Sequence, residues 1–291
     1  MDATSLVLGY GWADDRPYLW VRDAFADARR RVVLDGSFRA QVTGPRRCTG
    51  YFDGEQGKSC PGRRTVTRGT SCPACLKQDA FRPCMTCDGH RCPRLPPAMQ
   101  RYCRQDHHLY LACFGDETIK VGTASHPRRD LRIVEQGPLF AARIARAEGP
   151  IIKQMEHALA KGSFTETMRR SRKTALLAGG MTEDGAREHV LQAIERVQEE
   201  LPIELHRHLH PPEPVPQPDW ATRSRSLAVQ PLNNLDDAVL EGEVVGAIGH
   251  VLFLDDGDGT FALDLGDLKG RMLDWHPDRA AKKPVVQLGL F

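Results

Sequence analysis

Cysteine spacing is the strongest chemical signal in this sequence. Eight of the nine cysteines lie between Cys48 and Cys103, and CPAC and CMTC each carry a CxxC pair. Thiolates at that spacing bind one metal ion from a single tight turn, and four ligands complete the tetrahedron of a structural zinc site. An iron–sulfur cluster also takes four thiolates, but the paired knuckles favour zinc. The expected ligands form two zinc sites: Cys48, Cys60, Cys72 and Cys75 in the first, and Cys84, Cys87, Cys92 and Cys103 in the second, with His107 competing as a fourth ligand.

The loops between these cysteines are rich in Gly, Pro, Ser and Arg, and basic residues there outnumber acidic ones. The segment has few apolar side chains that could form a core, so it is expected to fold around metal ions. The basic surface suits DNA or RNA, tRNA included, because phosphates bound by Lys and Arg release counterions. A solvated surface with no ligand is the alternative. The candidate nucleic-acid contacts are Arg63, Arg64, Arg68 and Arg143.

A second group of reactive side chains lies on a pattern of short strands and helices. Alternation in LYLACF predicts a strand over residues 109–114, and IKVG predicts a second strand after the turn residues Gly and Asp. The basic loop PRRDLR follows. Pro138 suits the first turn of a helix that runs to about Ala147, and another helix begins after Pro150.

Glu156 lies on the second of these helices, one turn after Ile152 and on the same apolar face. A carboxylate among apolar neighbours needs a metal, a proton or a cationic partner. Its oxygens suit Mg²⁺ or another divalent ion, which would bear charge on the leaving oxygen of a phosphodiester. The structural alternative pairs Glu156 with Arg143 or Arg129.

This order of elements resembles the GIY-YIG nuclease fold, in which two short strands carry tyrosine signatures, an arginine follows, and a metal-binding glutamate comes later. Tyr110 matches the first tyrosine and Gly122 the signature glycine, whereas Lys120 stands where the family has its second tyrosine. The resemblance implies a Mg²⁺-dependent endonuclease in which Tyr110 orients or deprotonates water. Lys120 would take the base role if burial and nearby arginines lower its pKa, or would contact phosphate. The implied catalytic residues are Tyr110, Lys120, one or more of Arg128, Arg129 and Arg132, and Glu156.

Six short motifs connect the whole chain to a second family: CTGYFDG, PCMTCDG, LYLACFG, IKVGTA, EQGPL and IKQME. In these motifs the chain is similar to a bacterial and archaeal family of unknown function, domain of unknown function 2797. That similarity implies no particular activity.

The sequence predicts an α+β protein of several parts. A β-rich N-terminal unit would occupy residues 1–47, zinc-binding knuckles 48–107, and a GIY-YIG-like α/β core with a helical extension 108–210. PPEPVPQP indicates a stiff Pro-rich linker over 211–226. Two apolar runs split by DDGDG predict a hairpin in a small β-rich C-terminal domain, residues 227–291. Two shorter predictions are a helix in DAFADARRR and a last strand in PVVQLGLF.

Charge and hydropathy bound the class of protein. The formal net charge is +2, no stretch approaches the length of an apolar membrane span, and the first residues lack the pattern of a secretory signal. A cytoplasmic protein with reduced cysteines is therefore expected, with no membrane partner. The expected function is zinc-dependent nucleic-acid binding with metal-dependent phosphodiester cleavage. Two alternatives stay open: a non-catalytic zinc-dependent nucleic-acid-binding protein, and an enzyme that uses the same pocket for different chemistry on tRNA or another phosphorylated substrate.

Overall fold

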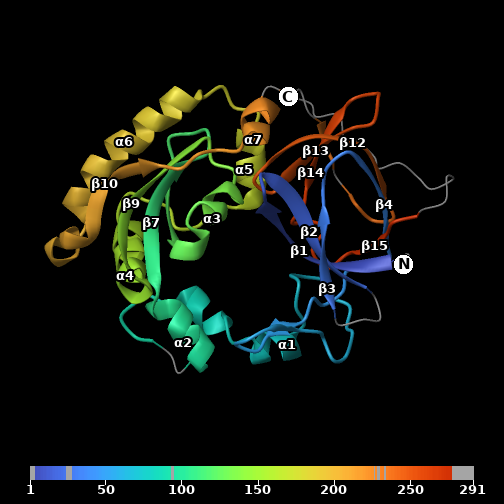
Figure 1. Ribbon diagram of the computed structural model, residues 1–291, viewed down its shortest axis with the longest axis horizontal. Coiled ribbons are helices and arrows are strands. Elements are labelled where there is room, and N and C mark those ends of the chain that lie inside the picture. Colours follow the sequence, from blue (N-terminus) through green and yellow to red (C-terminus); the bar gives the residue numbers. More distant parts are fainter. Residues whose placement is uncertain are drawn as a thin grey trace. The chain divides into compact units, whose positions relative to one another are not determined.

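The computed structural model describes residues 4–23, 28–92, 95–225, 227, 230–232 and 234–276. The fold is mixed α and β, with large and mainly antiparallel sheets (Figure 1). It divides into two compact units. Unit 1 comprises Met1–Asp79 and Pro218–Phe291, and unit 2 comprises Ala80–Gln217. None of the helices in the described residues is long and apolar enough to cross a membrane.

Unit 1 is built on a nine-stranded sheet in the order β11-β14-β13-β12-β4-β15-β1-β2-β3. Its buried residues alternate along strands such as Ser37–Thr43, as expected where one face of a sheet is covered. A tight turn at Asp14 and Asp15, both with positive φ, joins the first two strands. The strands are β1 (Thr4–Ala13), β2 (Arg16–Asp23), β3 (Arg29–Val33), β4 (Ser37–Thr43), β11 (Gln230–Pro231), β12 (Val239–Ile248), β13 (Val251–Asp255), β14 (Thr260–Asp264) and β15 (Met272–Asp274).

Both ends of the chain contribute to this sheet. β15 lies between β4 and β1, and β12 pairs with β4, so the β-rich segments predicted as separate N-terminal and C-terminal domains share one ladder of hydrogen bonds. Sequence patterning could not show this, because strand pairing between distant segments leaves no local signal. The hairpin predicted at DDGDG is confirmed as β13 and β14. The last strand predicted in PVVQLGLF lies outside the described residues.

Two local predictions in unit 1 need correction. DAFADARRR was predicted to be a helix, but Arg29–Val33 forms the edge strand β3, paired with β2, and residues 24–27 are outside the described part. The single knuckle segment predicted over 48–107 is divided between the units at Asp79 and Ala80. The part in unit 1 carries three short elements: β5 (Tyr51–Phe52), β6 (Gly57–Lys58) and α1 (Pro73–Gln78).

Unit 2 is organised around a four-stranded antiparallel sheet in the order β10-β9-β7-β8. Its strands are β7 (Asp106–Cys113), β8 (Ile119–Ser125), β9 (Phe140–Glu148) and β10 (Leu209–Pro214). Alternation along β7 sends Leu109 and Leu111 to one face, where they join a core with the apolar stripes of α4 and α6. Tyr110 and Ala112 belong to the opposite face and a separate cluster. That second face carries the polar pocket described below.

Two helices of unit 2 follow the sequence patterns. The helix predicted after Pro150 is α4 (Gly149–Ala160), and Glu156 is buried on it beside Ile152 and Met155. The long helix α6 (Glu183–Glu200) begins at Thr182, whose side chain accepts a hydrogen bond from the Gly185 amide at 3.1 Å. The shorter helices are η1 (Arg82–Thr86), α2 (Pro97–Arg104), η2 (His126–Arg128), α3 (Leu131–Val134), α5 (Arg170–Leu176) and η3 (Ile203–His208), and unit 1 adds α7 (Asp219–Ser224).

The helix predicted from Pro138 to Ala147 is wrong, because Phe140–Glu148 is the strand β9. Alanine and arginine favour helices in isolation, but here β9 pairs with β7 on one side and β10 on the other. The segment predicted as a Pro-rich linker also differs. Leu209–Pro214 is the edge strand β10, and the boundary between the units falls after Gln217. Prolines suit this position because an edge strand leaves many amides without a strand partner.

Candidate metal centre and polar pocket

Four cysteines of unit 1 meet at one point. The sulfurs of Cys48, Cys60, Cys72 and Cys75 all lie within 4.8 Å of one another, and all four side chains are buried. The 3.9 Å between the Cys60 and Cys72 sulfurs is far beyond a disulfide bond. It is close to the edge of about 3.8 Å that a tetrahedron with a Zn–S bond of about 2.3 Å requires. These four cysteines can hold a metal ion such as zinc, as the sequence predicted.

The surroundings of the four thiols suit negative charge. The amides of Gly50 and Cys72 donate to the Cys48 sulfur at 3.4 and 3.1 Å. The Cys75 amide lowers the pKa of Cys72 to about 7, whereas burial raises the pKa of Cys75. Four adjacent thiolates repel one another, so a bound cation is the natural way to ionise all of them.

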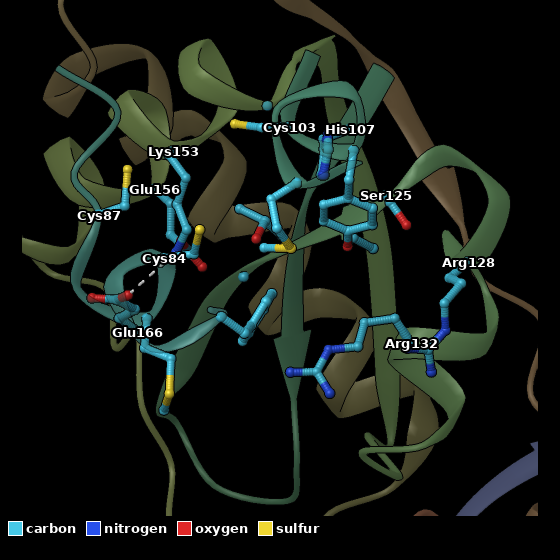
Figure 2. Close-up of a pocket in the computed structure, with 18 of the residues that line it drawn as sticks. Cys84, Cys87, Cys103, His107, Ser125, Arg128, Arg132, Lys153, Glu156 and Glu166 are labelled. Atoms are coloured by element: carbon cyan, nitrogen blue, oxygen red, sulfur yellow. Dashed lines mark hydrogen bonds and ion pairs between the residues drawn. The ribbon is translucent and has the colours of Figure 1, made fainter. Parts of the chain in front are cut away.

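The second predicted cysteine set is brought to one cavity but not to one point. Cys84, Cys87, Cys92, Cys103 and His107 all line the same pocket in unit 2. Within the described residues, no three ligand atoms of this set come as close together as those of the first set. Figure 2 shows the sulfurs of Cys84, Cys87 and Cys103 apart from one another and not directed at a common point. The His107 ring contacts the Gln105 carbonyl at 2.9 Å and the edge of Tyr102, and the second zinc site stays a prediction.

This cavity, of about 510 Å³, also gathers the residues that the nuclease resemblance singles out: Tyr110, Lys120, Gly122, Arg128, Arg132 and Glu156. Figure 2 labels Arg128, Arg132 and Glu156 among the residues that line it. Tyr110 on β7 pairs across the sheet with Gly122 on β8. A Cβ at Gly122 would stand 2.5 Å from the Tyr110 ring atom Cζ, so glycine is needed for the ring to lie over that strand. Burial raises the pKa of Tyr110, which keeps its hydroxyl protonated at neutral pH.

Lys120 lies two residues before Gly122 and on the same face of the sheet. Its side chain is almost fully buried, and its ammonium donates to the carbonyls of Val121, at 3.2 Å, and Glu166. Burial lowers the pKa of Lys120 to about 8, because the charge of Glu156 only partly offsets the loss of hydration. Burial and the charge of Arg132 thus shift this pKa in the direction that a base role for Lys120 requires.

Glu156 has a partner that the sequence reading did not name. Lys153, one turn earlier on α4, places its Nζ 2.5 Å from a Glu156 oxygen and 3.7 Å from a Glu166 oxygen (Figure 2). Arg143 and Arg129, the partners considered from the sequence, are engaged elsewhere. The spacing of three residues on one helix was the available signal. Burial raises the pKa of Glu156. Burial also acts to lower the pKa of Lys153, but the charge and hydrogen bond of Glu156, together with the charge of Glu166, raise it overall.

The three arginines of the basic loop are not equivalent. One guanidinium nitrogen of Arg128 donates to both carboxylate oxygens of the buried Glu135, at 2.6 and 2.7 Å. Arg129 contacts the His126 carbonyl at 3.2 Å and Asp130 at 3.7 Å. Within the described residues, the Arg132 guanidinium makes no hydrogen bond or ion pair, and Figure 2 shows it pointing into the pocket. Arg132 is therefore the arginine of this loop that is free to meet a bound anion.

The predicted nucleic-acid contacts also differ in how exposed and how strongly paired they are. Arg63, Arg64 and Arg68 are exposed on the cysteine loops of unit 1. Arg143 is mostly buried on β9 and pairs with Asp130 and with Glu213, the latter at 3.1 Å. This pairing favours a structural role for Arg143.

Two polar residues were missed, the partly buried Gln136 and the buried Lys173. Gln136 donates through Nε2 to the Tyr110 hydroxyl, and the ammonium of Lys173 donates to Gln136 Oε1 at 3.0 Å. Burial, followed by the charges of Lys120 and Arg132, lowers the pKa of Lys173 to about 7. Lys173 precedes Leu176 and Leu177 by three and four residues, a spacing that places them on one helix face and was the available signal.

The fold and the four-thiol cluster together define a mixed α/β protein with a candidate structural metal centre. The chain belongs to the family described as protein of unknown function (DUF2797), whose profile matches residues 38–272. The matched region contains the metal centre and every residue of the pocket. Comparison with curated proteins and with solved structures found no match.

Proposed function

We propose that this protein binds nucleic acid and cleaves a phosphodiester in the pocket of unit 2, with a divalent ion at Glu156. One observation carries the proposal: a single cavity gathers Tyr110, Lys120, Arg132 and Glu156 from two strands and two helices. A phenol, an amine of lowered pKa, an unpaired guanidinium and a buried carboxylate are the groups that phosphoryl chemistry uses. Their order along the chain resembles that of the GIY-YIG nucleases.

Each residue has a distinct role in this proposal. The Arg132 guanidinium binds the scissile phosphate and offsets the charge that develops on it. Lys120, with a pKa of about 8, accepts the proton of the attacking water in its neutral form. The Tyr110 hydroxyl, held over Gly122, orients that water or a phosphate oxygen.

Glu156 and Glu166 would hold the divalent ion. Carboxylate oxygens suit Mg²⁺, which takes one or two protein carboxylates and completes its shell with water and substrate phosphate. Such an ion bears charge on the leaving oxygen. In this structure the Lys153 ammonium lies against both carboxylates, so it must move aside for the ion to bind.

Zinc at Cys48, Cys60, Cys72 and Cys75 would hold the loops that carry Arg63, Arg64 and Arg68. These loops have little core of their own, and their exposed arginines would contact phosphates outside the pocket. A second zinc ion would bind Cys84, Cys87, Cys92 and Cys103 and draw one wall of the pocket together.

The test is cleavage of labelled DNA, RNA and tRNA with Mg²⁺ by the wild-type protein and by Glu156→Gln. The amide keeps the shape of the side chain and removes the charge that binds the ion, so we expect cleavage to be lost and nucleic-acid binding to be kept. Glu199→Gln, at an exposed position on α6, is the matched control and should leave cleavage unchanged. Wild-type protein that cleaves none of the three nucleic acids with Mg²⁺ or Mn²⁺ rules the proposal out.

The second candidate is a zinc-dependent nucleic-acid-binding module without catalysis. It is favoured by the Lys153 ammonium, which already neutralises Glu156, and by the two carbonyls that engage Lys120. On this reading the wild-type protein binds nucleic acid without cleaving it. Glu156→Gln then lowers stability and leaves binding intact, because Glu156 acts only as an ion-pair partner. Turnover of a phosphorylated substrate without strand cleavage would instead indicate different chemistry in the same pocket.

A further inference from the structure

The side-chain amide of Gln136 is held by three hydrogen bonds. Its Nε2 donates to the Tyr110 hydroxyl and to the Arg132 carbonyl, the latter at 3.2 Å. Its Oε1 accepts from the Lys173 ammonium at 3.0 Å. The amide therefore links the tyrosine of β7 to α3, which carries Arg132, and to α5.

These partners determine which way round the amide lies. A backbone carbonyl can only accept, so the amide nitrogen must face Arg132. The amide oxygen then faces Lys173, whose Nζ can donate to it whether or not the amine is protonated. The Tyr110 oxygen shares the nitrogen side and must accept. A hydroxyl that accepts from Gln136 keeps its own hydrogen for another partner, and Tyr110 lines the cavity with Lys120 and Arg132.

Packing alone does not explain a lysine at position 173. Its side chain is almost fully buried, and its ammonium lies 4.4 Å from the centre of the Phe114 ring. Within the described residues, the Lys173 ammonium contacts that ring and the neutral Gln136 amide, and it contacts no carboxylate. A buried ammonium without a carboxylate lowers stability, so a specific use for its donor is expected.

We propose that Gln136, held in one orientation by Lys173, is a positioning residue that makes Tyr110 a hydrogen-bond donor to substrate in the pocket. The hydroxyl donates to a phosphate oxygen or to the attacking water, while Gln136 donates to the hydroxyl. The identity of that acceptor rests on the proposed function above. The orientation of Gln136 and Tyr110 does not depend on it.

The experiment reads the Tyr110 hydroxyl directly. Protein is labelled with ¹³C at tyrosine Cζ, and the Tyr110 resonance is assigned by its loss in Tyr110→Phe. Gln136→Glu replaces the donor with an acceptor, so we expect Tyr110 to donate to Glu and its resonance to move. Lys173→Met releases the amide and should broaden or move the same resonance, whereas Lys173→Arg keeps a donor and should return it toward the wild-type position.

Cleavage provides the second readout. We expect Gln136→Glu and Lys173→Met to slow cleavage about tenfold to a hundredfold, with partial rescue by Lys173→Arg. A folded Gln136→Glu protein with an unmoved Tyr110 resonance overturns the inference, as does Lys173→Met that loses thermal stability alone. If Gln136→Glu does not fold, Gln136→Met, which is uncharged and of similar size, replaces it with the same criterion. If the wild-type protein cleaves no nucleic acid, the proposed function is ruled out. The Tyr110 resonance still tests the orientation of Gln136 and Tyr110 in that case.

Discussion

The ring of Tyr110 lies over the bare backbone of Gly122, its cross-strand partner on β8. A side chain at position 122 would occupy the space that the phenol fills, so one glycine decides where the hydroxyl stands in the pocket. This contact also places the Tyr110 hydroxyl beside a candidate catalytic residue, because Lys120 lies on the same face of β8 as Gly122.

Gly122→Ala tests this relationship. The added methyl must displace the Tyr110 ring, so we expect unfolding free energy to fall by about 1–3 kcal/mol, as for an overpacked core. The measurement is urea unfolding followed by circular dichroism. Gly180→Ala is the control in the same unit, since a Cβ there meets nothing within 4 Å. Equal stability of the two variants would show that the ring moves freely.

The metal centre predicts the zinc content of point variants. Wild-type protein should carry at least one zinc ion per chain, and Cys75→Ser should lose one equivalent because a buried four-thiol site tolerates no missing ligand. Elemental analysis of purified protein provides the measurement. Cys113→Ser, which removes a buried thiol outside both cysteine sets, should keep the full zinc content. If Cys87→Ser also carries one zinc ion fewer than the wild type, the second site is established. Iron in place of zinc in the wild-type protein would contradict a zinc site at the first set of cysteines.

Lys120 predicts how cleavage depends on pH. Only the neutral amine accepts a proton, so cleavage should rise as pH passes about 8, and Lys120→Gln should be slow at every pH. The measurement is a pH profile of single-turnover cleavage at saturating Mg²⁺. A profile that keeps its rise in Lys120→Gln would assign the proton transfer to another group.

Stability provides an independent check on the same amine. The folded protein holds the Lys120 proton less tightly than the unfolded chain, where the ordinary pKa is 10.5. Between about pH 8 and 10.5 the unfolded chain therefore binds more protons, and stability should rise with pH in that window. Urea unfolding of Lys120→Gln should show a weaker rise than the wild type. An identical rise in both proteins would mean that Lys120 titrates normally.

The arginines predict two different phenotypes. Changing Arg63, Arg64 and Arg68 together to Ala should lower the slope of log affinity against log salt by up to about 3, as for three lost phosphate contacts. Arg143→Ala should leave that slope unchanged and lower thermal stability, because Arg143 pairs with Asp130 and Glu213. Fluorescence anisotropy with labelled duplex and tRNA gives the slopes. The reverse assignment of the two phenotypes would contradict the structural reading of Arg143.

Local chemistry in the sequence was sufficient for several parts of this protein. The CxxC pair at Cys72 and Cys75 specified a metal-binding turn, since the spacing itself brings two sulfurs together. The apolar stripe of Glu183–Glu200 and its cap at Thr182 specified a helix and its first residue. Glu156 was found because a carboxylate on an apolar helix face stands out in any sequence.

Only the tertiary structure decided what these parts meet. Phe140–Glu148 has helix-forming residues and is a strand, because pairing with β7 and β10 outweighs local preference. The two ends of the chain share a sheet because strand partners are chosen by long-range burial, which sequence spacing does not record. For the same reason the link from Lys173 through Gln136 to Tyr110 appears only when distant side chains are packed together.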